Sequence, residues 1–437
     1  MKNILNVLKN VLKGIAFFII MIAVFCLILT FSYALPNTNI RQHLADSVET
    51  IKSEGGFYYR PFFGTQNVFA EAHTLDDYTD SLILCAALDK GEDQGKNVFD
   101  RAMENYRYED KEKGPVESFA DAIDENNEAN SNYTRYWFGI EAFLRPLLLL
   151  FNFQTIRYIN MIFIFILLVI STVPISKKLG LKYAIAFDTA IFFMGITIIP
   201  VSLQYIPVMA ITLIASIVIL CVENSKKFDK LLPYFFIAIG GCTAFMDLLT
   251  YPLVTLGIPM VLVILLKLKH GSNFKDLMIT IIKLSIIWGI SYGATYFVKW
   301  VITSIVMGQN VITEAINQFL YRIDADGSTQ ISKFEVISRN FKVYFNAFVL
   351  GLLVIYLIFW AIGLKKYRKE NINVKNIIPL IIFALIPYAW YIVLSNHSGI
   401  HYWMTYRIQA ITLLSLLSAS LYVIDDEKIK KIGKEKE

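Results

Sequence analysis

Residues 15 to 35 read IAFFIIMIAVFCLILTFSYAL, an apolar run without a charged residue near the amino end of the chain. The run is longer than the apolar core of a signal peptide, which is about 7–15 residues, and Ser32-Tyr33-Ala34 matches a cleavage site poorly. We therefore interpret it as a retained membrane anchor. Lys2, Lys9 and Lys13 precede the run, so we expect its amino end to face the cytoplasm.

The composition of the rest of the chain extends this interpretation. Hydrophobic residues make up 56% of the 437 positions, charged residues only 18%, and the mean hydropathy is +0.51. A soluble domain carries about 25% charged residues, so this composition predicts a polytopic membrane protein. The net charge of +5 comes from short lysine clusters between apolar runs, which favours a topology signal over nucleic-acid binding. The four cysteines have no spacing typical of a disulfide framework or a zinc site.

The apolar runs predict an all-α fold with about ten transmembrane helices. They lie near residues 11–35, 155–175, 183–200, 202–222, 231–246, 252–267, 276–297, 341–364, 377–394 and 407–424. Every second connection is rich in lysine, and these connections all fall on one side of the predicted membrane. The positive-inside rule then predicts a multi-pass protein of the cell membrane with both termini in the cytoplasm.

This topology divides the chain into four parts. They are an amino-terminal part with the first helix (1–35), a long extracytoplasmic loop (36–154), a multi-span bundle with a second external loop near 300–340 (155–424), and a basic cytoplasmic tail (425–437). Within the long loop, apolar spacing predicts a helix over 70–88. Residues 137–151 predict an amphipathic helix in the membrane interface, whereas the acidic stretch 94–132 is expected to be mobile.

The long loop contains three acids within five positions, Asp76, Asp77 and Asp80. Asp76 and Asp80 would share one face of a helix, where like charges repel each other. Such a run is either a solvated surface or a chemical site built around a positive charge. The neighbouring aromatic run 57–63, which includes Arg60, suits either sugar stacking or contact with the bilayer.

A second polar cluster lies at residues 396–407, which read NHSGIHYWMTYR. His397 and His401 could bind a metal, although Ser398-Gly399 favours a turn; with Tyr406 and Arg407 they could instead bind an anion, or simply cap a span. Asp247 and Tyr251 stand at the predicted outer end of the fifth span, where an end cap and a functional role are both open. The further candidates for external phosphate ligands are Arg60, Arg145 and Arg157. Arg157 heads the second span, where it could equally anchor the helix at the membrane interface.

Carboxylates and Arg/His groups on one face of many spans suit an enzyme that handles a lipid-linked substrate. A polyprenyl phosphate would place its tail between helices and its phosphate at the interface. An Asp of the loop could then act as general base on an acceptor hydroxyl, while Arg and His stabilise the leaving phosphate. A divalent cation, Mg²⁺ or Mn²⁺, is a possible cofactor, and the sequence fixes no ligand set for it.

The layout resembles the GT-C superfamily of integral membrane glycosyltransferases. The resemblance comes from a cytoplasmic amino end, one helix, a large first external loop with acids and then a multi-span bundle, together with the stretches 76–80 (DDYTD), 135–137 (RYW), 143–147 (FLRPL), 247–252 (DLLTYP) and 396–403 (NHSGIHYW). It implies a polyprenyl-phosphate sugar as donor, a glycan, lipid or protein of the cell envelope as acceptor, and Asp76 or Asp77 as the base. The superfamily's acids usually lie soon after the first helix, whereas Asp76 comes about 40 residues beyond it, so Asp80 or Glu71 are alternatives.

Two other functions fit the same composition. A transporter or flippase for a lipid-linked saccharide would carry polar groups near the middle of the membrane, often in paired halves. A scaffold of a surface-polysaccharide system would need no active site. The test that separates the enzyme from these is whether Asp76 or Asp77 and the 397–407 cluster converge on one cavity that opens to the outer leaflet.

Overall fold

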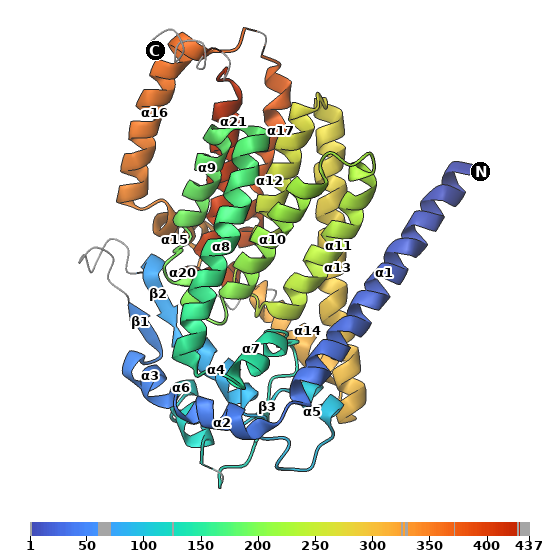
Figure 1. The fold of residues 1–437 in the computed structure, drawn as a ribbon, viewed down its shortest axis with the longest axis vertical. Helices are drawn as coiled ribbons and strands as arrows, with labels where there is room; N and C mark the ends of the chain where they lie inside the picture. The colour runs from blue at the N-terminus through green and yellow to red at the C-terminus, as the bar shows by residue number, and fades with distance from the viewer. Residues whose placement is uncertain are drawn as a thin grey trace.

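The structure is a computed structural model that describes residues 2–59, 71–124, 126–324, 327, 331–370, 372–425 and 428. Long helices run roughly along one axis, and the described residues between 37 and 152 form a compact layer across one end of them (Figure 1). We call this layer the cap. The fold is all-α apart from short two-stranded sheets, as the sequence predicts.

Within the described residues, six helical segments are long and apolar enough to cross a membrane. They are α1 (Lys2–Tyr33, whose candidate span is Leu8–Tyr33), α8 (Phe153–Leu179), α11 (Phe228–Met246), α13 (Phe274–Met307), α16 (Ala347–Tyr367) and the segment Val374–Val393. Four shorter helices complete the bundle: α9 (Leu181–Phe192), α10 (Ile206–Val222), α12 (Leu253–Lys269) and α21 (Ala410–Tyr422). The chain is therefore a polytopic helical membrane protein, because a bilayer requires about 20 apolar residues for each helical span.

Helix α12 forms the centre of the bundle. Its side chains from Leu253 to Leu266 are all buried, and it packs against α10, α11, α13 and α21. An apolar surface on every side of a helix is typical of such a central position. Helix α16 is the opposite case, because it stands at the edge of the bundle and leaves most of its apolar side chains exposed (Figure 1).

The last apolar segments are broken by prolines. Val374–Val393 consists of η3 (Val374–Asn376), α17 (Ile378–Phe383) and α18 (Ile386–Val393), and Pro379 and Pro387 each stand in the first turn of a new helix. Proline lacks the N–H that would continue the preceding helix, so it is favoured at such starts. The chain then passes through α19 (Ser395–Ile400), α20 (Tyr402–Thr405) and η4 (Tyr406–Gln409) before α21.

The cap is made of short elements. They are α2 (Asn37–Ala45), α3 (Val48–Glu54), β1 (Phe57–Tyr59), η1 (Glu71–His73), β2 (Thr74–Asp76), α4 (Asp77–Ala87), α5 (Val98–Glu104), β3 (Tyr106–Arg107), α6 (Pro115–Ala122), β4 (Ser131–Asn132) and α7 (Glu141–Leu148). Strands β1 and β2 are antiparallel with Phe57 opposite Asp76, and β3 pairs with β4.

The cap corrects two expectations. Residues 94–132 were expected to be mobile, but their described part contains α5, β3, α6 and β4, with Ala102, Met103 and Phe119 buried. The predicted helix over 70–88 begins only at Asp77, because the preceding residues pair as a strand. The predicted helix over 137–151 is present as the shorter α7, which packs against α1 and α2.

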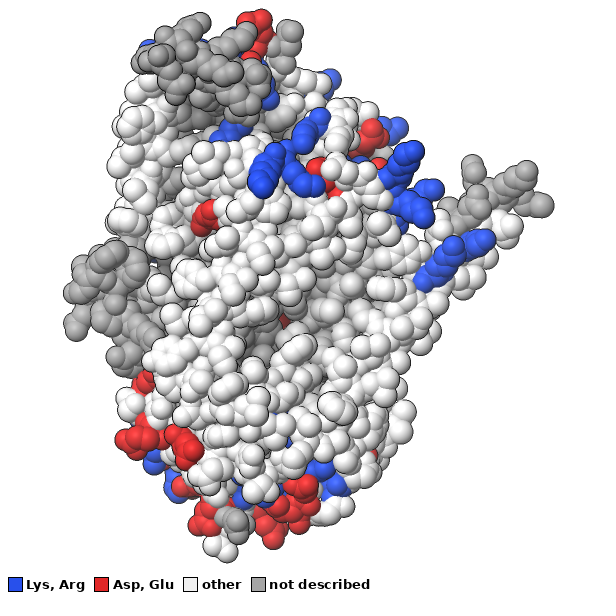
Figure 2. Space-filling view, in the orientation of Figure 1, with Lys and Arg blue, Asp and Glu red and all other residues white. Residues whose placement is uncertain are grey.

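The second external loop predicted near residues 300–340 is largely helical in its described part. Short helices α14 (Val311–Arg322) and α15 (Lys333–Tyr344) follow the long α13, and α15 packs against α18, α19 and α20. The 3₁₀ turn η2 (Ile199–Val201) connects α9 to α10 and packs against α8. Lysines and arginines gather at the end of the bundle opposite the cap, and a nearly uncharged band lies between the two ends (Figure 2).

Candidate functional site

The segment 395–409 folds back against the start of α4, and this contact builds the site. Asp76 ends β2 and is the N-cap residue of α4: its Oδ1 accepts a hydrogen bond from the Thr79 amide at 3.0 Å. Its Oδ2 accepts one from Nε1 of Trp403 at 3.3 Å. The carboxyl group is 2% exposed, and burial raises its pKa. Asp76 and the 397–407 cluster, which are 327 residues apart at this bond, therefore meet directly.

Asp80 has a different task. Its Oδ2 accepts from the Leu203 amide at 2.9 Å, and its Oδ1 accepts from the Gln204 amide at 3.1 Å and from the Ser202 hydroxyl at 3.2 Å. Both oxygens thus hold the turn that precedes α10. Burial raises the pKa of this carboxyl to about 7, against the lowering effect of Arg157 and the two amides. Asp80 therefore has a structural role in this turn.

Asp77 forms an ion pair at the boundary between the cap and α8. Its Oδ1 lies 2.9 Å from Arg157, whose other terminal nitrogen lies 2.7 Å from Glu54. The second oxygen, Oδ2, has no hydrogen-bond partner among the described residues. Burial and the neighbouring Asp80 raise the pKa of Asp77, and Arg157 opposes them.

The idea of a solvated acidic surface is therefore wrong for all three acids. Asp76, Asp77 and Asp80 are 2%, 0% and 0% exposed, and each carboxylate has its own partners. Asp76 is the N-cap of α4 and Asp77 and Asp80 lie in its first turn, and repulsion among the three acids adds to the effect of burial on the pKa of Asp77 and Asp80. Sequence spacing alone could not show this, since it depends on where the strand ends and the helix begins.

Arg407 is the most unusual residue of the cluster. It is 0% exposed, and its NH1 group donates to the Trp403 carbonyl at 2.9 Å. Its Nε and NH2 nitrogens have no hydrogen-bond partner in the part of the chain that the structure describes. The guanidinium carbon lies 4.0, 4.8 and 5.7 Å from the ring centres of Tyr205, Tyr406 and Tyr251. A buried cation is thus held by aromatic rings, without an ion-pair partner among the described residues.

The tyrosines around Arg407 are themselves fixed. The Tyr251 hydroxyl donates to the Tyr205 carbonyl at 2.5 Å, and the Tyr406 hydroxyl lies 2.9 Å from the carbonyl oxygen of Ala72. Gly195, with φ +84°, also lies next to Arg407. A Cβ at this position would stand 2.8 Å from the Ala72 carbonyl oxygen and 3.6 Å from Arg407 NH2. Glycine is required at this position both for its backbone conformation and for space.

The two histidines do not form a metal pair. Arg322 donates to His397 Nδ1 at 2.6 Å, so that nitrogen is unprotonated, and Nε2 then donates to the Leu249 carbonyl at 2.8 Å. His397 is therefore neutral, and burial together with Arg322 lowers its pKa well below the ordinary value. His401 lies beside it with 4.9 Å between ring centres. Burial and Arg322 lower its pKa to about 4, and its Nδ1 has no partner among the described residues.

Asp247 caps the turn between α11 and α12. Its carboxylate accepts from the Thr250 amide at 3.1 Å and from the Thr250 hydroxyl at 2.5 Å. Burial raises its pKa to about 7, and the Thr250 bonds oppose this. His397 bonds to Leu249 in the same turn, so Asp247 stabilises a turn that the 397–407 cluster contacts. Nothing in its contacts directs it toward Asp76.

The phosphate candidate Arg145 lies away from the site. Arg145 is fully buried in the cap, where it bonds to the Ala87 carbonyl, to Asn37 at 2.5 Å and to the Ser32 carbonyl at 3.1 Å, with Asp89 at 3.6 Å. Its donors are used by the protein, so the structure does not bring it to the site. Arg60 lies outside the described residues.

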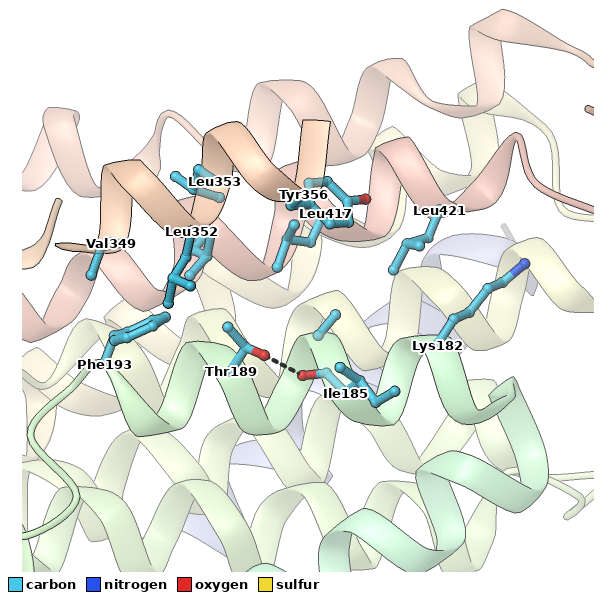
Figure 3. Close-up of a pocket in the computed structure, with 12 residues that line it drawn as sticks. Lys182, Ile185, Thr189, Phe193, Val349, Leu352, Leu353, Tyr356, Leu417 and Leu421 are labelled. Atoms are coloured by element: carbon cyan, nitrogen blue, oxygen red, sulfur yellow. Dashed lines mark hydrogen bonds between the residues drawn. The ribbon is translucent and has the colours of Figure 1, made fainter. Parts of the chain in front are cut away.

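An apolar groove lies among the helices of the bundle. It lies between α9, α16 and α21, has a volume of about 360 Å³, and is lined by residues such as Ile185, Leu352 and Leu417 (Figure 3). Lys182 stands at one end of it and Phe193 at the other. Phe193 also lines a much smaller cavity that reaches Gly195, the residue packed against Arg407.

Three contributors to the site were not predicted. Trp403 joins Arg407 to Asp76, Gln204 donates to the Asp76 carbonyl at 3.3 Å, and Arg322 fixes the histidines. Ser202, Gln204 and Tyr205 did carry a signal, because they are polar residues gathered in the turn between two apolar runs. Among the described residues, no group of three or more His, Cys, Asp or Glu side chains is placed to hold a metal ion. The divalent cation stays a prediction.

Comparison of the chain with protein-family models, curated proteins and solved structures gave no match in any of the three.

Proposed function

We propose that the protein is a membrane glycosyltransferase of the GT-C type, with about ten spans, which moves a sugar from a polyprenyl phosphate to an acceptor of the cell envelope. The observation that carries this proposal is the buried Arg407. Its Nε and NH2 groups lack partners among the described residues, and it is joined through Trp403 to the Asp76 carboxyl group. A buried donor that is left unsatisfied costs free energy, which a bound anion would recover.

The apolar groove supports a lipid-linked donor. It runs along α9 from Lys182 to Phe193 between helices that a bilayer would surround (Figure 3). A polyprenyl tail would fill it with branched hydrocarbon, and the small cavity beyond Phe193 leads toward Gly195 and Arg407. In this arrangement the phosphate would accept hydrogen bonds from Nε and NH2 of Arg407, which is the fork geometry that guanidinium groups offer to phosphate.

Asp76 is our choice for the general base. Asp76 is the acid that bonds to Trp403 of the 397–407 cluster, whereas Asp80 holds the turn before α10 and Asp77 is paired with Arg157. A carboxyl group whose pKa is raised by burial is better matched to proton transfer near neutral pH than an ordinary aspartate.

In the proposed step the acceptor hydroxyl oxygen attacks the anomeric carbon of the donor sugar. The bond from that carbon to the phosphate oxygen breaks as the new glycosidic bond forms. The hydroxyl proton passes to Asp76, and the electron pair of the broken bond stays on the phosphate. Arg407 stabilises the charge that develops there.

The sidedness of the proposal follows from charge. The end of the bundle opposite the cap gathers Lys and Arg (Figure 2), and cytoplasmic loops carry such an excess. The cap and Asp76 would then face outward from a plasma membrane, with both chain termini in the cytoplasm. Lipid-linked sugars on the outer leaflet and envelope glycans are the partners that this side would offer.

The test uses the full-length protein in lipid vesicles with radiolabelled polyprenyl-phosphate glucose and mannose and an envelope fraction as acceptor. We expect label to move into the envelope fraction and Asp76→Asn to reduce the rate about 100- to 10,000-fold. Asparagine retains an oxygen for the Thr79 amide, so the N-cap should survive. The matched control is Asp93→Asn, since Asp93 is an exposed acid of the same cap.

Two outcomes would count against the enzyme. Equal rates for Asp76→Asn and Asp93→Asn would remove Asp76 as the base. Movement of the intact labelled lipid across the vesicle bilayer, with no label reaching the acceptor, would favour a transporter of the lipid-linked saccharide.

A further inference from the structure

A second pocket lies in the cap, away from Arg407 and from the lipid groove. It is formed where α4 packs against α6 and the chain leaving β3, and its volume is about 230 Å³. Its walls include Tyr78 and Cys85 of α4, Arg107 and Glu109 near β3, and Ser118 of α6. Ligand pockets for larger molecules have about 300–1,000 Å³, so this one suits a unit of the size of one sugar ring.

Arg107 gives the pocket its chemical character. It is 4% exposed, and its NH2 group donates to Glu109 at 3.1 Å. Its Nε and NH1 groups have no hydrogen-bond partner within the residues that the structure describes. The guanidinium carbon lies 5.2 Å from the centre of the Tyr133 ring, which fixes its plane from one side. Two donor groups on a rigid, buried side chain are therefore left for an oxygen-bearing ligand.

The same pocket also offers acceptors. Glu109 is held by Arg107 and by the Ser131 hydroxyl at 2.6 Å, and these contacts, opposing the effect of burial, lower its pKa. It stays ionised and can accept from a ligand hydroxyl. Lys111 and Asp110 line the rim, so positive and negative groups balance. A ligand with many hydroxyls, which both donate and accept, fits this mixture better than a simple anion.

A row of three aromatic rings, Tyr78, Phe57 and Trp403, begins at the pocket. Tyr78 lines it and is 46% exposed, and its ring stacks on Phe57 with 6.1 Å between centres and 12° between planes. Phe57 in turn meets Trp403 edge to face at 5.5 Å. Because Trp403 donates to Asp76, this row of rings extends from the pocket to the proposed base.

We propose that this pocket binds one sugar unit of a glycan, with its hydroxyls on Arg107 and Glu109 and its ring against Tyr78. The glycan would extend over Phe57 toward Asp76, so that the pocket holds the acceptor at a distance from the reacting hydroxyl. Only this acceptor role rests on the proposed function. Saccharide binding by the pocket does not depend on it.

The binding test needs no lipid donor. Saturation-transfer NMR on the full chain in nanodiscs would use glucose, galactose, N-acetylglucosamine, glucuronic acid and their short oligomers as probes, with inorganic phosphate as competitor. We expect at least one sugar to bind with millimolar affinity. Tyr78→Ala should weaken that binding about tenfold, whereas Tyr78→Phe, which keeps the ring, should change it less than about twofold.

The matched control is Tyr321→Ala on α14, because Tyr321 is similarly exposed, at 50%, and does not line the pocket. It should leave sugar binding unchanged. The proposal is overturned if no probe sugar receives saturation, if Tyr78→Ala binds like the parent protein, or if phosphate alone binds.

Failure of the two proposals can be told apart. Sugar binding that depends on Tyr78, without any sugar transfer from polyprenyl-phosphate donors, would reject the glycosyltransferase and keep the saccharide pocket. Transfer that proceeds in Tyr78→Ala with an unchanged KM for the glycan would keep the enzyme and reject the pocket as its acceptor site.

Discussion

Two buried arginines show how the same side chain serves two regions of this molecule. Arg145, in the cap, bonds to Ala87, Asn37 and Ser32 and lies near Asp89. Arg407, in the segment before α21, bonds only to the carbonyls of Trp403 and Met404, and two of its nitrogens have no partner among the described residues. Both are 0% exposed. Burial alone therefore does not distinguish the two arginines; the number of their donors that have partners does.

The two regions also differ in what surrounds each arginine. Asp89 is shared by Arg145 at 3.6 Å and Arg101 at 2.6 Å, and Arg101 reaches the Tyr33 carbonyl at the end of α1. This ionic cluster ties the first span to the cap. The Arg407 region has no carboxylate in that role among the described residues; it has three aromatic rings.

We expect the largest effect, on stability, from breaking the ionic cluster of Arg145, Asp89 and Arg101. Arg145→Ala removes three hydrogen bonds and leaves Asp89 with one partner fewer in a buried site, so we expect the free energy of unfolding to fall by about 3–5 kcal/mol. Thermal unfolding in detergent measures it. Arg339→Ala, which breaks an exposed pair with Glu335, is the control and should cost less than about 1 kcal/mol. Equal losses for both variants would mean that the cap does not depend on the cluster.

The corresponding substitution in the segment before α21 is Arg407→Met. We expect transfer from the polyprenyl-phosphate donor to fall about 100- to 1000-fold, because the developing phosphate charge loses its stabilising group. The unfolding temperature should stay far closer to that of the parent protein than in Arg145→Ala. A variant that unfolds as easily as Arg145→Ala would erase the contrast between the two arginines.

A smaller effect concerns Glu141, a fully buried neighbour of Arg145 whose two oxygens lack partners among the described residues. Burial raises its pKa from 4.5 to about 8, so the folded state keeps a proton that the unfolded state releases in this range. Stability should therefore fall as the pH rises from about 5 to about 8. Glu141→Gln removes this dependence and should gain about 1–3 kcal/mol over the parent protein at the upper end. If the free energy of unfolding changed with pH in the same way for the parent protein and for Glu141→Gln, this prediction would be wrong.

The smallest effect tests whether the donor's tail binds in the apolar groove between α9, α16 and α21. Leu352→Trp narrows it, and we expect KM for a long-chain polyprenyl-phosphate sugar to rise about five- to tenfold, with less change for a short-chain donor. Leu350→Trp lies on the same helix, outside the groove lining, and serves as control. A similar KM for both variants would show that the tail binds elsewhere.

Much of the fold could be predicted from apolar run length. The first span, the long α8, α11, α13 and α16 coincide with predicted runs, because a helix that crosses a bilayer needs enough apolar residues for its own length. The cap was predicted poorly. Its short elements are stabilised by contacts between distant residues such as Arg145 and Asn37, and these leave no local period in the sequence.

The candidate site divides in the same way. The sequence by itself determined a polytopic helical protein and the residue types that cluster at 76–80 and 397–407, since hydropathy and composition are local properties. Only the tertiary structure decided that Asp76 bonds to Trp403, that Asp80 and Arg145 are fully occupied, and that Arg407 is not. Whether a buried polar atom has a partner depends on chain segments hundreds of residues apart, and packing alone brings them together.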